Sequence, residues 1–274
     1  FNLDLSWYRD YHKFEKADNQ NAATKREYLL DKFNIKENLL NPVYLSISFR
    51  LNNSSNFDKI KKYPPFRYFT YNTITELDFD FNKIKNFNNV YLSGFWQKNN
   101  LFEEYRDILK EELTLKNNMS EKNTILLDKI KSSSSIAIHI RRGDLLSRPI
   151  AVAEQPSSSK QYYYNAINKI KWKVEKPEVF VFSDDINWVK NNYKFDIPTT
   201  YIDNEGPDFE HFKLMCNCKH QIIANSTFSW WAAWLNNYQE KIVISPKWWY
   251  RDPIKNESII RIPENWIILN NIEG

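Results

Sequence analysis

The feature that most constrains this chain is a strand pattern that ends in charged residues. Residues 135–144 read Ser-Ile-Ala-Ile-His-Ile-Arg-Arg-Gly-Asp, with isoleucines alternating with small or polar residues as in a β-strand. In an open parallel sheet, ligands bind beyond the carboxyl ends of the strands. Arg141 and Arg142 therefore suit a multiply charged oxyanion such as a pyrophosphate, and Gly143 allows a tight turn. The alternative is a surface ion pair between Arg142 and Asp144.

Strands and helices alternate after this stretch, which predicts a parallel sheet with right-handed crossovers. The strands are expected at 136–140, 179–182, 199–202, 221–224 and 241–245, and the helices at 160–172, 185–192, 208–218 and from about 227. A serine-rich hinge at 132–135 precedes them. We therefore expect an α/β protein of two Rossmann-like domains, covering residues 1–133 and 134–274.

The amino-terminal half gives weaker patterns. Residues 1–5 alternate like a strand, 24–32 suggest a helix, 43–50 a strand and 52–65 a loop. Residues 90–96 indicate a strand ending in a glycine turn. Apolar residues from Leu101 to Leu109 recur at helical spacing, and Ser120 is a good N-cap for a helix running to about Lys131.

Polar residues follow the predicted strands and are expected to converge on one edge of the sheet. Ser183, Asp184 and Asp185 follow the second strand. One of these carboxylates could accept a hydrogen bond from a base or a ribose, and the alternative is a simple helix cap. Both alternatives can apply, the ligand contact to one of these residues and the helix cap to another.

The segment 225–234, Asn-Ser-Thr-Phe-Ser-Trp-Trp-Ala-Ala-Trp, is the second informative stretch. Ser226, Thr227 and Ser229 lie where a helix begins, so their hydroxyls and the free backbone N–H groups can form a phosphate site without a metal. The alternative is an ordinary N-cap followed by tryptophans that pack in the core.

Composition narrows the function classes. Aromatic residues make up 16% of the chain, which favours a sugar or nucleotide ligand. The net charge of +4 is spread along the chain, so it implies no nucleic-acid site but allows a weak attraction to anionic lipid surfaces. No apolar run could span a bilayer. The oligomeric state is not indicated.

The two cysteines, Cys216 and Cys218, lie too close in sequence for a structural disulfide and indicate a reducing, cytoplasmic compartment. They could ligate zinc with His220, but we favour small buried residues. Asp78 and Asp80 could hold a divalent cation, although their apolar neighbours favour a strand with one wet face. We expect no metal and no cofactor.

Several motifs resemble those of the alpha-1,2-fucosyltransferases, glycosyltransferase family 11. They occur in order over roughly residues 90–250. The long tryptophan motif is too specific for a chance match. The matching segments are 93–97, 139–144, 181–185, 222–235 and 241–248.

The resemblance implies a GT-B-type, metal-independent, inverting transferase that moves L-fucose from GDP-fucose to the 2-hydroxyl of a galactose-type glycan acceptor. It implies that Arg141 binds the pyrophosphate and stabilises the leaving group, with Arg142 assisting. Asp144 is a candidate for the catalytic base. The remaining substrate-binding residues would be His139, Ser183, Asp184, Asp185, Asn225, Ser226, Thr227, Phe228 and Ser229.

One departure from the family is visible. The family usually opens with a Gly-Gly-Leu-Gly-Asn turn, whereas this chain has four glycines and no such run. Phe1–Trp7 resembles the strand after that turn, so we expect an incomplete amino-terminal domain. The alternatives in function are a non-catalytic carbohydrate-binding protein and a GT-B transferase with a different nucleotide sugar.

Overall fold

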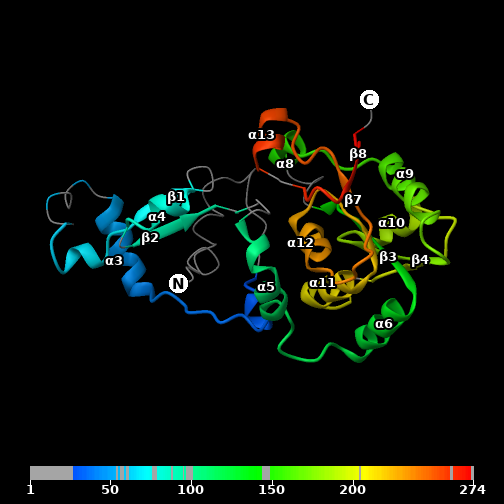
Figure 1. Cartoon of the computed structure of the whole chain (residues 1–274), viewed down its shortest axis with the longest axis horizontal. Coiled ribbons are helices and arrows are strands. Elements are labelled where there is room, and N and C mark those ends of the chain that lie inside the picture. The colour runs from blue at the N-terminus through cyan, green and yellow to red at the C-terminus, as the bar shows by residue number, and fades with distance from the viewer. Residues whose placement is uncertain are drawn as a thin grey trace. The chain divides into compact units, whose positions relative to one another are not determined.

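The computed structural model describes residues 27–272 with gaps at 54, 56–58, 60–61, 76–78, 88, 95, 97–100, 144–148, 204 and 260–261. The chain forms two compact units (Figure 1). Among the described residues, one unit contains Lys36–Trp96 and the other contains Leu29–Ile35 with the chain from Gln97 onward. The predicted strand at 1–5 lies outside the described residues.

The second unit is built on a six-stranded sheet in which every pair of neighbouring strands is parallel. Its strands are β3 (Ser134–Ile140), β4 (Pro177–Ser183), β5 (Thr199–Tyr201), β6 (His220–Ile222), β7 (Val243–Pro246) and β8 (Ile267–Leu269). Their order in space is β5-β4-β3-β6-β7-β8. The first five were predicted from the sequence, and the α/β class with parallel sheets flanked by helices is confirmed.

The strand order creates a switch point between β3 and β6. From β3 the chain builds outward through β4 to β5, then crosses back to β6 and builds in the opposite direction. The loops after β3 and β6 therefore leave the sheet on opposite faces, and in open α/β sheets ligands bind at the carboxyl edge of such a switch point.

Helices cover both faces of this sheet (Figure 1). Ile136, Ile138 and Ile140 of β3 pack in one cluster with α9 and α10, while Ala137 packs in another with α6 and α11. Because both faces of β3 are buried, its central residues are apolar on both sides. The helices are α6 (Glu121–Ser132), α8 (Pro149–Glu154), α9 (Lys160–Lys171), α10 (Ile186–Asn192), α11 (Asp208–Asn217), α12 (Thr227–Leu235) and α13 (Pro253–Ile259).

The predicted cap of α6 is confirmed. The Ser120 hydroxyl accepts a hydrogen bond from the Asn123 backbone N–H at 3.4 Å. The buried Glu210 carboxylate of α11 also accepts from the Ser120 hydroxyl at 2.8 Å and from the Asn123 side chain at 2.6 Å. One carboxylate therefore ties the start of α6 to α11.

The strand predicted at 43–50 is wrong, because this segment forms helix α3 (Pro42–Asn53). Leu45, Ser48 and Leu51 are buried at a spacing of three residues, which matches a helix face. Pro42 suits the first position of a helix, where no backbone N–H is needed. The Asn41 side chain accepts from the Val43 N–H at 2.8 Å.

The rest of the first unit is small. Strand β1 (Asn72–Thr75) pairs in parallel with β2 (Val90–Ser93), which confirms the strand predicted near 90. Helix α4 (Phe81–Ile84) lies between them in the chain, and a 3₁₀ turn, η3, covers Phe66–Tyr68.

Other sequence predictions need adjustment. The helix predicted at 24–32 is only a 3₁₀ turn, η1 (Leu30–Lys32), among the described residues. The helical segment at 101–109 is a 3₁₀ turn, η5 (Glu103–Tyr105), followed by α5 (Arg106–Glu112). Helices α5 and α6 lie in the second unit. The functional division at 133/134 stays a prediction.

Tyr162 fastens α9 to the sheet and offers a test of the fold. Its hydroxyl, which is fully buried, lies 2.7 Å from the Ile223 carbonyl oxygen and 3.2 Å from that of Ile244. Tyr162→Phe leaves these carbonyls without that donor, so we expect a loss of about 1–3 kcal/mol in unfolding free energy. Urea unfolding measures it. Tyr164→Phe, at a half-buried position, is the control, and equal losses in both variants would contradict the prediction.

Candidate functional site

Arg141 lies at the carboxyl end of β3 and faces the switch point. Its guanidinium Nη1 is 3.4 Å from the backbone carbonyl oxygen of Asn225, in the turn after β6. The side chain is half-buried. Arg141 thus lies at the switch point of the sheet, and its binding of an oxyanion stays a prediction.

Arg142 turns the other way, toward β4 and α10. Its backbone N–H donates to Asp184 Oδ1 at 2.9 Å, and its Nε lies 3.4 Å from Asp185 Oδ2. Its guanidinium carbon is 3.1 Å from the centroid of the Trp188 ring. The two adjacent arginines therefore diverge, and Arg142 is held by three groups of the β4–α10 turn.

The Ser183–Asp185 turn carries both a cap and ion-pair contacts. Asp185 is the N-cap of α10, and its Oδ1 accepts from the Trp188 N–H at 3.3 Å. The Ser183 hydroxyl accepts from the Asp185 N–H at 3.0 Å. The capping alternative thus describes Asp185, while contact of these residues with a base or ribose stays a prediction.

Gly143 leaves room for Asp184. A Cβ atom added at position 143 would lie 2.8 Å from Asp184 Oδ2 and 3.2 Å from its carboxyl carbon. The absence of a side chain therefore lets the Asp184 carboxylate approach the turn after β3. Asp144, the candidate base, lies outside the described residues.

His139 is buried near the end of β3, with its ring centroid 5.8 Å from that of Phe228. Burial, with a smaller contribution from the Arg141 charge, lowers its pKa to about 3. Its Nδ1 has no hydrogen-bond partner among the described residues. The imidazole is therefore neutral at physiological pH, and it can serve as a hydrogen-bonding group but not as a cation.

The turn after β6 leads into α12. Asn225 is buried, and its side-chain amide donates to the Pro156 carbonyl at 2.6 Å, which ties this turn to the segment before α9. Ser226 is the N-cap residue of α12, and its side chain makes no capping hydrogen bond. Thr227 is exposed. Backbone N–H groups at this helix start can bind an anion.

Ser229 is a buried residue in the first turn of α12. Its side chain is fully buried, and its hydroxyl lies 3.2 Å from the Ser226 carbonyl oxygen and 3.5 Å from that of Ala224. The sequence grouped Ser229 with Ser226 and Thr227 as phosphate ligands. The structure brings all three residues to the start of α12, and contact of any of them with a phosphate stays a prediction.

The tryptophans of α12 pack in the core, as the alternative for this segment predicted. Trp230 and Trp234 are buried, and the Trp234 indole N–H donates to Glu103 Oε2 at 3.0 Å. The Arg106 guanidinium carbon lies 3.9 Å from the Trp234 ring centroid. These contacts anchor the helix whose amino-terminal end borders the switch point.

Trp188 is the residue near this turn that sequence reasoning missed. The signal was present, since it lies three residues after Asp185, where a capping side chain bonds the backbone N–H. Only the fold shows that the Trp188 ring, on α10, contacts Arg142, which follows β3.

No group of three or more His, Cys, Asp or Glu side chains able to hold a metal occurs in the described part of the chain. Cys216 and Cys218 are free thiols, and burial raises the pKa of Cys216 to about 12. They pack against the core, as favoured from the sequence. Asp78 lies outside the described residues. Within the described ranges, no helix has the length and apolar character required to span a bilayer.

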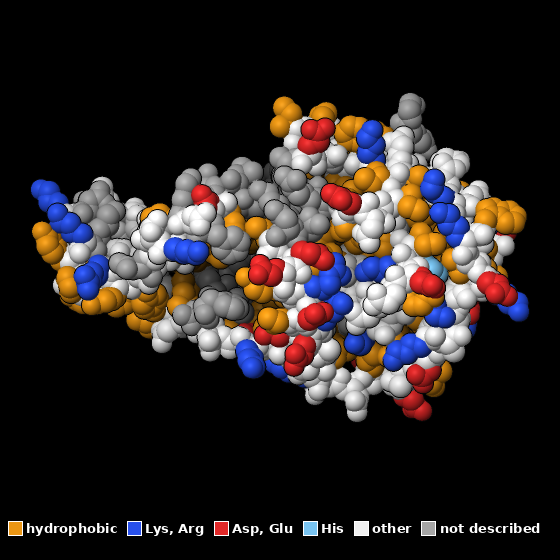
Figure 2. Space-filling model, viewed as in Figure 1, with side chains coloured by type: hydrophobic (Ala, Val, Ile, Leu, Met, Phe, Trp, Pro, Cys, Tyr) orange, Lys and Arg blue, Asp and Glu red, His pale blue; other side chains and the backbone are white. Residues whose placement is uncertain are grey.

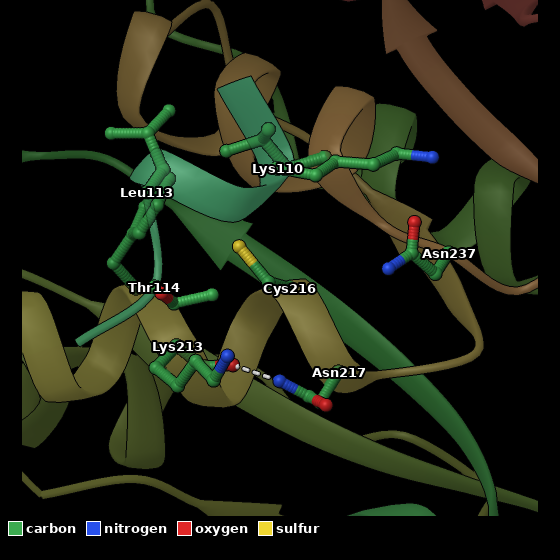
Figure 3. A pocket seen from close by; sticks show the side chains of 9 residues that line it. Lys110, Leu113, Thr114, Lys213, Cys216, Asn217 and Asn237 are labelled. Carbon is green, nitrogen blue, oxygen red and sulfur yellow. Dashed lines mark hydrogen bonds between the residues drawn. The ribbon is translucent and has the colours of Figure 1, made fainter. Parts of the chain in front are cut away.

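The second unit has a cavity of about 120 Å³ at the ends of α5, α11 and α12 (Figure 3). It is lined by Lys110, Leu113, Thr114, Phe212, Lys213, Cys216, Asn217, Leu235 and Asn237. None of these residues belongs to the turns after β3, β4 or β6. A cavity this small is below the usual range of about 300–1,000 Å³ for ligand sites, so it is not the candidate site.

Charged side chains of both signs are interspersed over the second unit on the face that Figure 2 shows. This face carries no large region of a single charge.

Comparison with known sequences identifies relatives. The family model described as Glycosyl transferase family 11 matches residues 14–270. An alpha-1,2-colitosyltransferase of Escherichia coli is 38% identical over 184 residues, which cover 65% of this chain and 62% of the relative. The O-antigen biosynthesis glycosyltransferase WbnK of Escherichia coli is 32% identical over 193 residues, 66% of this chain and 61% of the relative. The chain thus spans about three fifths of the length of these two relatives.

More distant matches are also present. Galactoside alpha-(1,2)-fucosyltransferase 1 of Leontocebus fuscicollis is 27% identical over 154 residues, which cover 53% of this chain and 42% of the relative. A solved structure of POFUT1 in complex with GDP-fucose aligns with a TM-score of 0.35 and 14% identity over 75% of this chain and 61% of that one. At that TM-score the likeness places no residue of this chain. The family resemblance expected from the motifs is confirmed.

Gly143→Ala tests the packing of the turn after β3. The added methyl group forces the Asp184 carboxylate away and weakens its bond to the Arg142 N–H. We expect a loss of about 1 kcal/mol in unfolding free energy, the usual net contribution of such a hydrogen bond. Urea unfolding of Gly143→Ala, alone and combined with Asp184→Ala, measures it. If the glycine substitution costs as much without the Asp184 carboxylate as with it, the crowding is not the cause.

His139→Gln tests the buried imidazole. The folded pKa of about 3 lies below the ordinary value of 6.5, so below pH 6.5 the unfolded chain takes up a proton that the folded chain refuses. This residue therefore makes stability fall as the pH drops from about 6.5 toward 3. We expect His139→Gln to lose less stability than the wild type between pH 7 and pH 5 in urea unfolding. An identical pH dependence in both proteins would contradict the assigned burial.

Proposed function

Since this chain belongs to glycosyl transferase family 11, we propose that it transfers L-fucose from GDP-fucose to the 2-hydroxyl of a galactose-type residue on a glycan acceptor. The observation that carries the proposal is the position of Arg141. It lies at the switch point of the sheet, in contact with the turn that leads into α12. An arginine and a helix amino-terminus on two sides of a switch point suit a nucleoside diphosphate.

The donor diphosphate would lie between the end of β3 and the start of α12. Arg141 would bind its oxygens, and the Ser226 and Thr227 hydroxyls with the first N–H groups of α12 would face it from the other side. Asn225 would act by positioning, because its side chain fastens this turn to Pro156. His139 would contribute as a neutral group beside Arg141.

The reaction would be a single displacement with inversion at the anomeric carbon. The acceptor hydroxyl oxygen forms a bond to that carbon as the bond to the diphosphate oxygen breaks, and GDP leaves with the bonding electrons. Negative charge grows on the diphosphate, where Arg141 and the helix start stabilise it more in the transition state than in the ground state. The acceptor proton passes to a base, for which Asp144 is the candidate.

No metal is required in this proposal, because a fixed guanidinium and helix N–H groups supply the positive potential. We also assign a GT-B arrangement to the whole enzyme and a cytoplasmic location with peripheral attraction to anionic membrane surfaces.

A related donor is the second candidate. The bacterial relative at 38% identity is named an alpha-1,2-colitosyltransferase. A nucleotide-linked colitose would use the same diphosphate site, so the two donors differ only in the sugar. A turnover comparison with GDP-fucose and GDP-colitose separates them. A non-catalytic sugar-binding protein would show no dependence on the nucleotide.

Arg141→Ala and Arg141→Lys test the proposal by calorimetric titration with GDP, GMP and UDP in EDTA. We expect the wild type to bind GDP more tightly than GMP or UDP. Arg141→Ala should lose about 10–100-fold in GDP affinity, because a hydrogen bond to a charged group contributes about 1.5–3 kcal/mol. Arg141→Lys should recover only part of this, since lysine lacks the planar fork.

Arg67→Ala, an exposed arginine of the first unit, is the matched control and should leave GDP affinity unchanged. Unchanged GDP affinity in Arg141→Ala would remove Arg141 from the site. Equal binding of GDP and UDP by the wild type would contradict the choice of donor nucleotide.

A further inference from the structure

Trp188 and Asp185 form a clamp on Arg142. Asp185 Oδ1 accepts from the Trp188 N–H at 3.3 Å, while Oδ2 of the same carboxylate lies 3.4 Å from Arg142 Nε. The Arg142 guanidinium carbon lies 3.1 Å from the Trp188 ring centroid. One carboxylate thus accepts from the Trp188 backbone N–H and lies beside the Arg142 guanidinium, and only 22% of the Arg142 side chain is exposed.

The contacts of Arg142 with Trp188 and Asp185 fix the same turn that carries Arg141. Arg142 is fixed by its side chain on Trp188 and by its backbone N–H on Asp184. Arg141, one residue earlier, contacts Asn225 on the opposite side. Because adjacent residues share a peptide plane, holding Arg142 on α10 restricts the direction in which Arg141 can point.

We propose that Trp188 is a positioning residue that holds Arg142 and thereby orients Arg141 toward the donor diphosphate. The proposal rests on the proposed function. In this arrangement Arg142 is an anchor for the turn, and Arg141 is the arginine that meets the phosphates. This changes the role expected for Arg142 from the sequence, which was direct assistance at the pyrophosphate.

A second cation, Lys160, also lies near the Trp188 ring. The Lys160 ammonium lies 5.8 Å from the Trp188 ring centroid and 5.6 Å from that of Tyr193. Aromatic faces attract cations through their quadrupole, so this pair of rings stabilises positive charge beside α10. Asp185 supplies the counter-charge to Arg142 in the same place.

The opposite hypothesis is that Trp188 stores Arg142 until a donor binds and Arg142 then moves onto the phosphates. The two hypotheses predict different outcomes when the indole is removed. If Trp188 anchors Arg142, removing the indole weakens diphosphate binding. If Trp188 stores Arg142, removing the indole frees Arg142, and diphosphate binding stays equal or becomes tighter.

The experiment is a calorimetric titration of Trp188→Leu, Trp188→Phe and the wild type with GDP, GMP and guanosine. We expect Trp188→Leu to lose about 10-fold in GDP affinity, within the range of a desolvated cation–π contact, and guanosine affinity to stay unchanged. Trp188→Phe retains a ring face and should stay within about 3-fold of the wild type. General destabilisation of the fold would lower the affinity for GDP and guanosine alike. It would not produce a loss of GDP affinity alone in Trp188→Leu that is absent in Trp188→Phe.

Two further variants keep the test independent of folding. Asp185→Asn preserves an N-cap side chain but removes the charge that holds Arg142, so GDP affinity should again fall selectively. Trp172→Leu is the matched control. Trp172 is 84% exposed, and Lys171 lies 5.4 Å from its ring centroid at the far end of α9. It should bind all three ligands like the wild type.

The outcomes separate the two proposals. If the wild type prefers GDP to guanosine and Trp188→Leu binds GDP equally or more tightly, the positioning role is wrong and the proposed function stands. An equal loss for GDP and guanosine also overturns the positioning role. If the wild type shows no preference for GDP, the proposed function falls and this inference falls with it.

Discussion

The structure depends on the burial of β3 on both faces. Its isoleucines pack against α9 and α10 on one side, while Ala137 faces α6 and α11 on the other. A strand held in this way cannot slide, because a shift by one residue would exchange the two sets of side chains. The two arginines that follow it therefore begin from a fixed point at the carboxyl edge of the sheet.

The strand order then gives these arginines different surroundings. β3 lies between β4 and β6, so the turn after it has the β4–α10 turn on one side and the β6–α12 turn on the other. Arg142 meets acidic groups and an indole on the first side, and Arg141 meets a backbone carbonyl and a helix start on the second. Arg141 and Arg142 are adjacent and carry the same charge, but they make different contacts because different groups surround them.

Sequence periodicity predicted most of the second unit. The alternation in β3, the Ser120 cap and the helix from Thr227 are local signals, and the structure has them where they were expected. The segment 43–50 is predicted as a strand but forms a helix, and the spacing of Leu45, Ser48 and Leu51 is the local signal for that helix. The strand β8 and the helices α8 and α13 were not predicted. The helix-start residues Ser226 and Ser229 carried the same sequence signal, yet one is the N-cap and the other bonds the carbonyl group of that N-cap.

By itself, the sequence determined the class of fold, the family and the residues that end each strand, because hydrophobic period and motif order are properties of short segments. Tertiary structure alone decided which of those strand ends become neighbours. The direction of each arginine and the contact of Trp188 with Arg142 depend on partners that lie between 42 and 84 residues away in the chain. Such contacts form only when the sheet order is fixed, since no local pattern specifies which helix packs beside which strand.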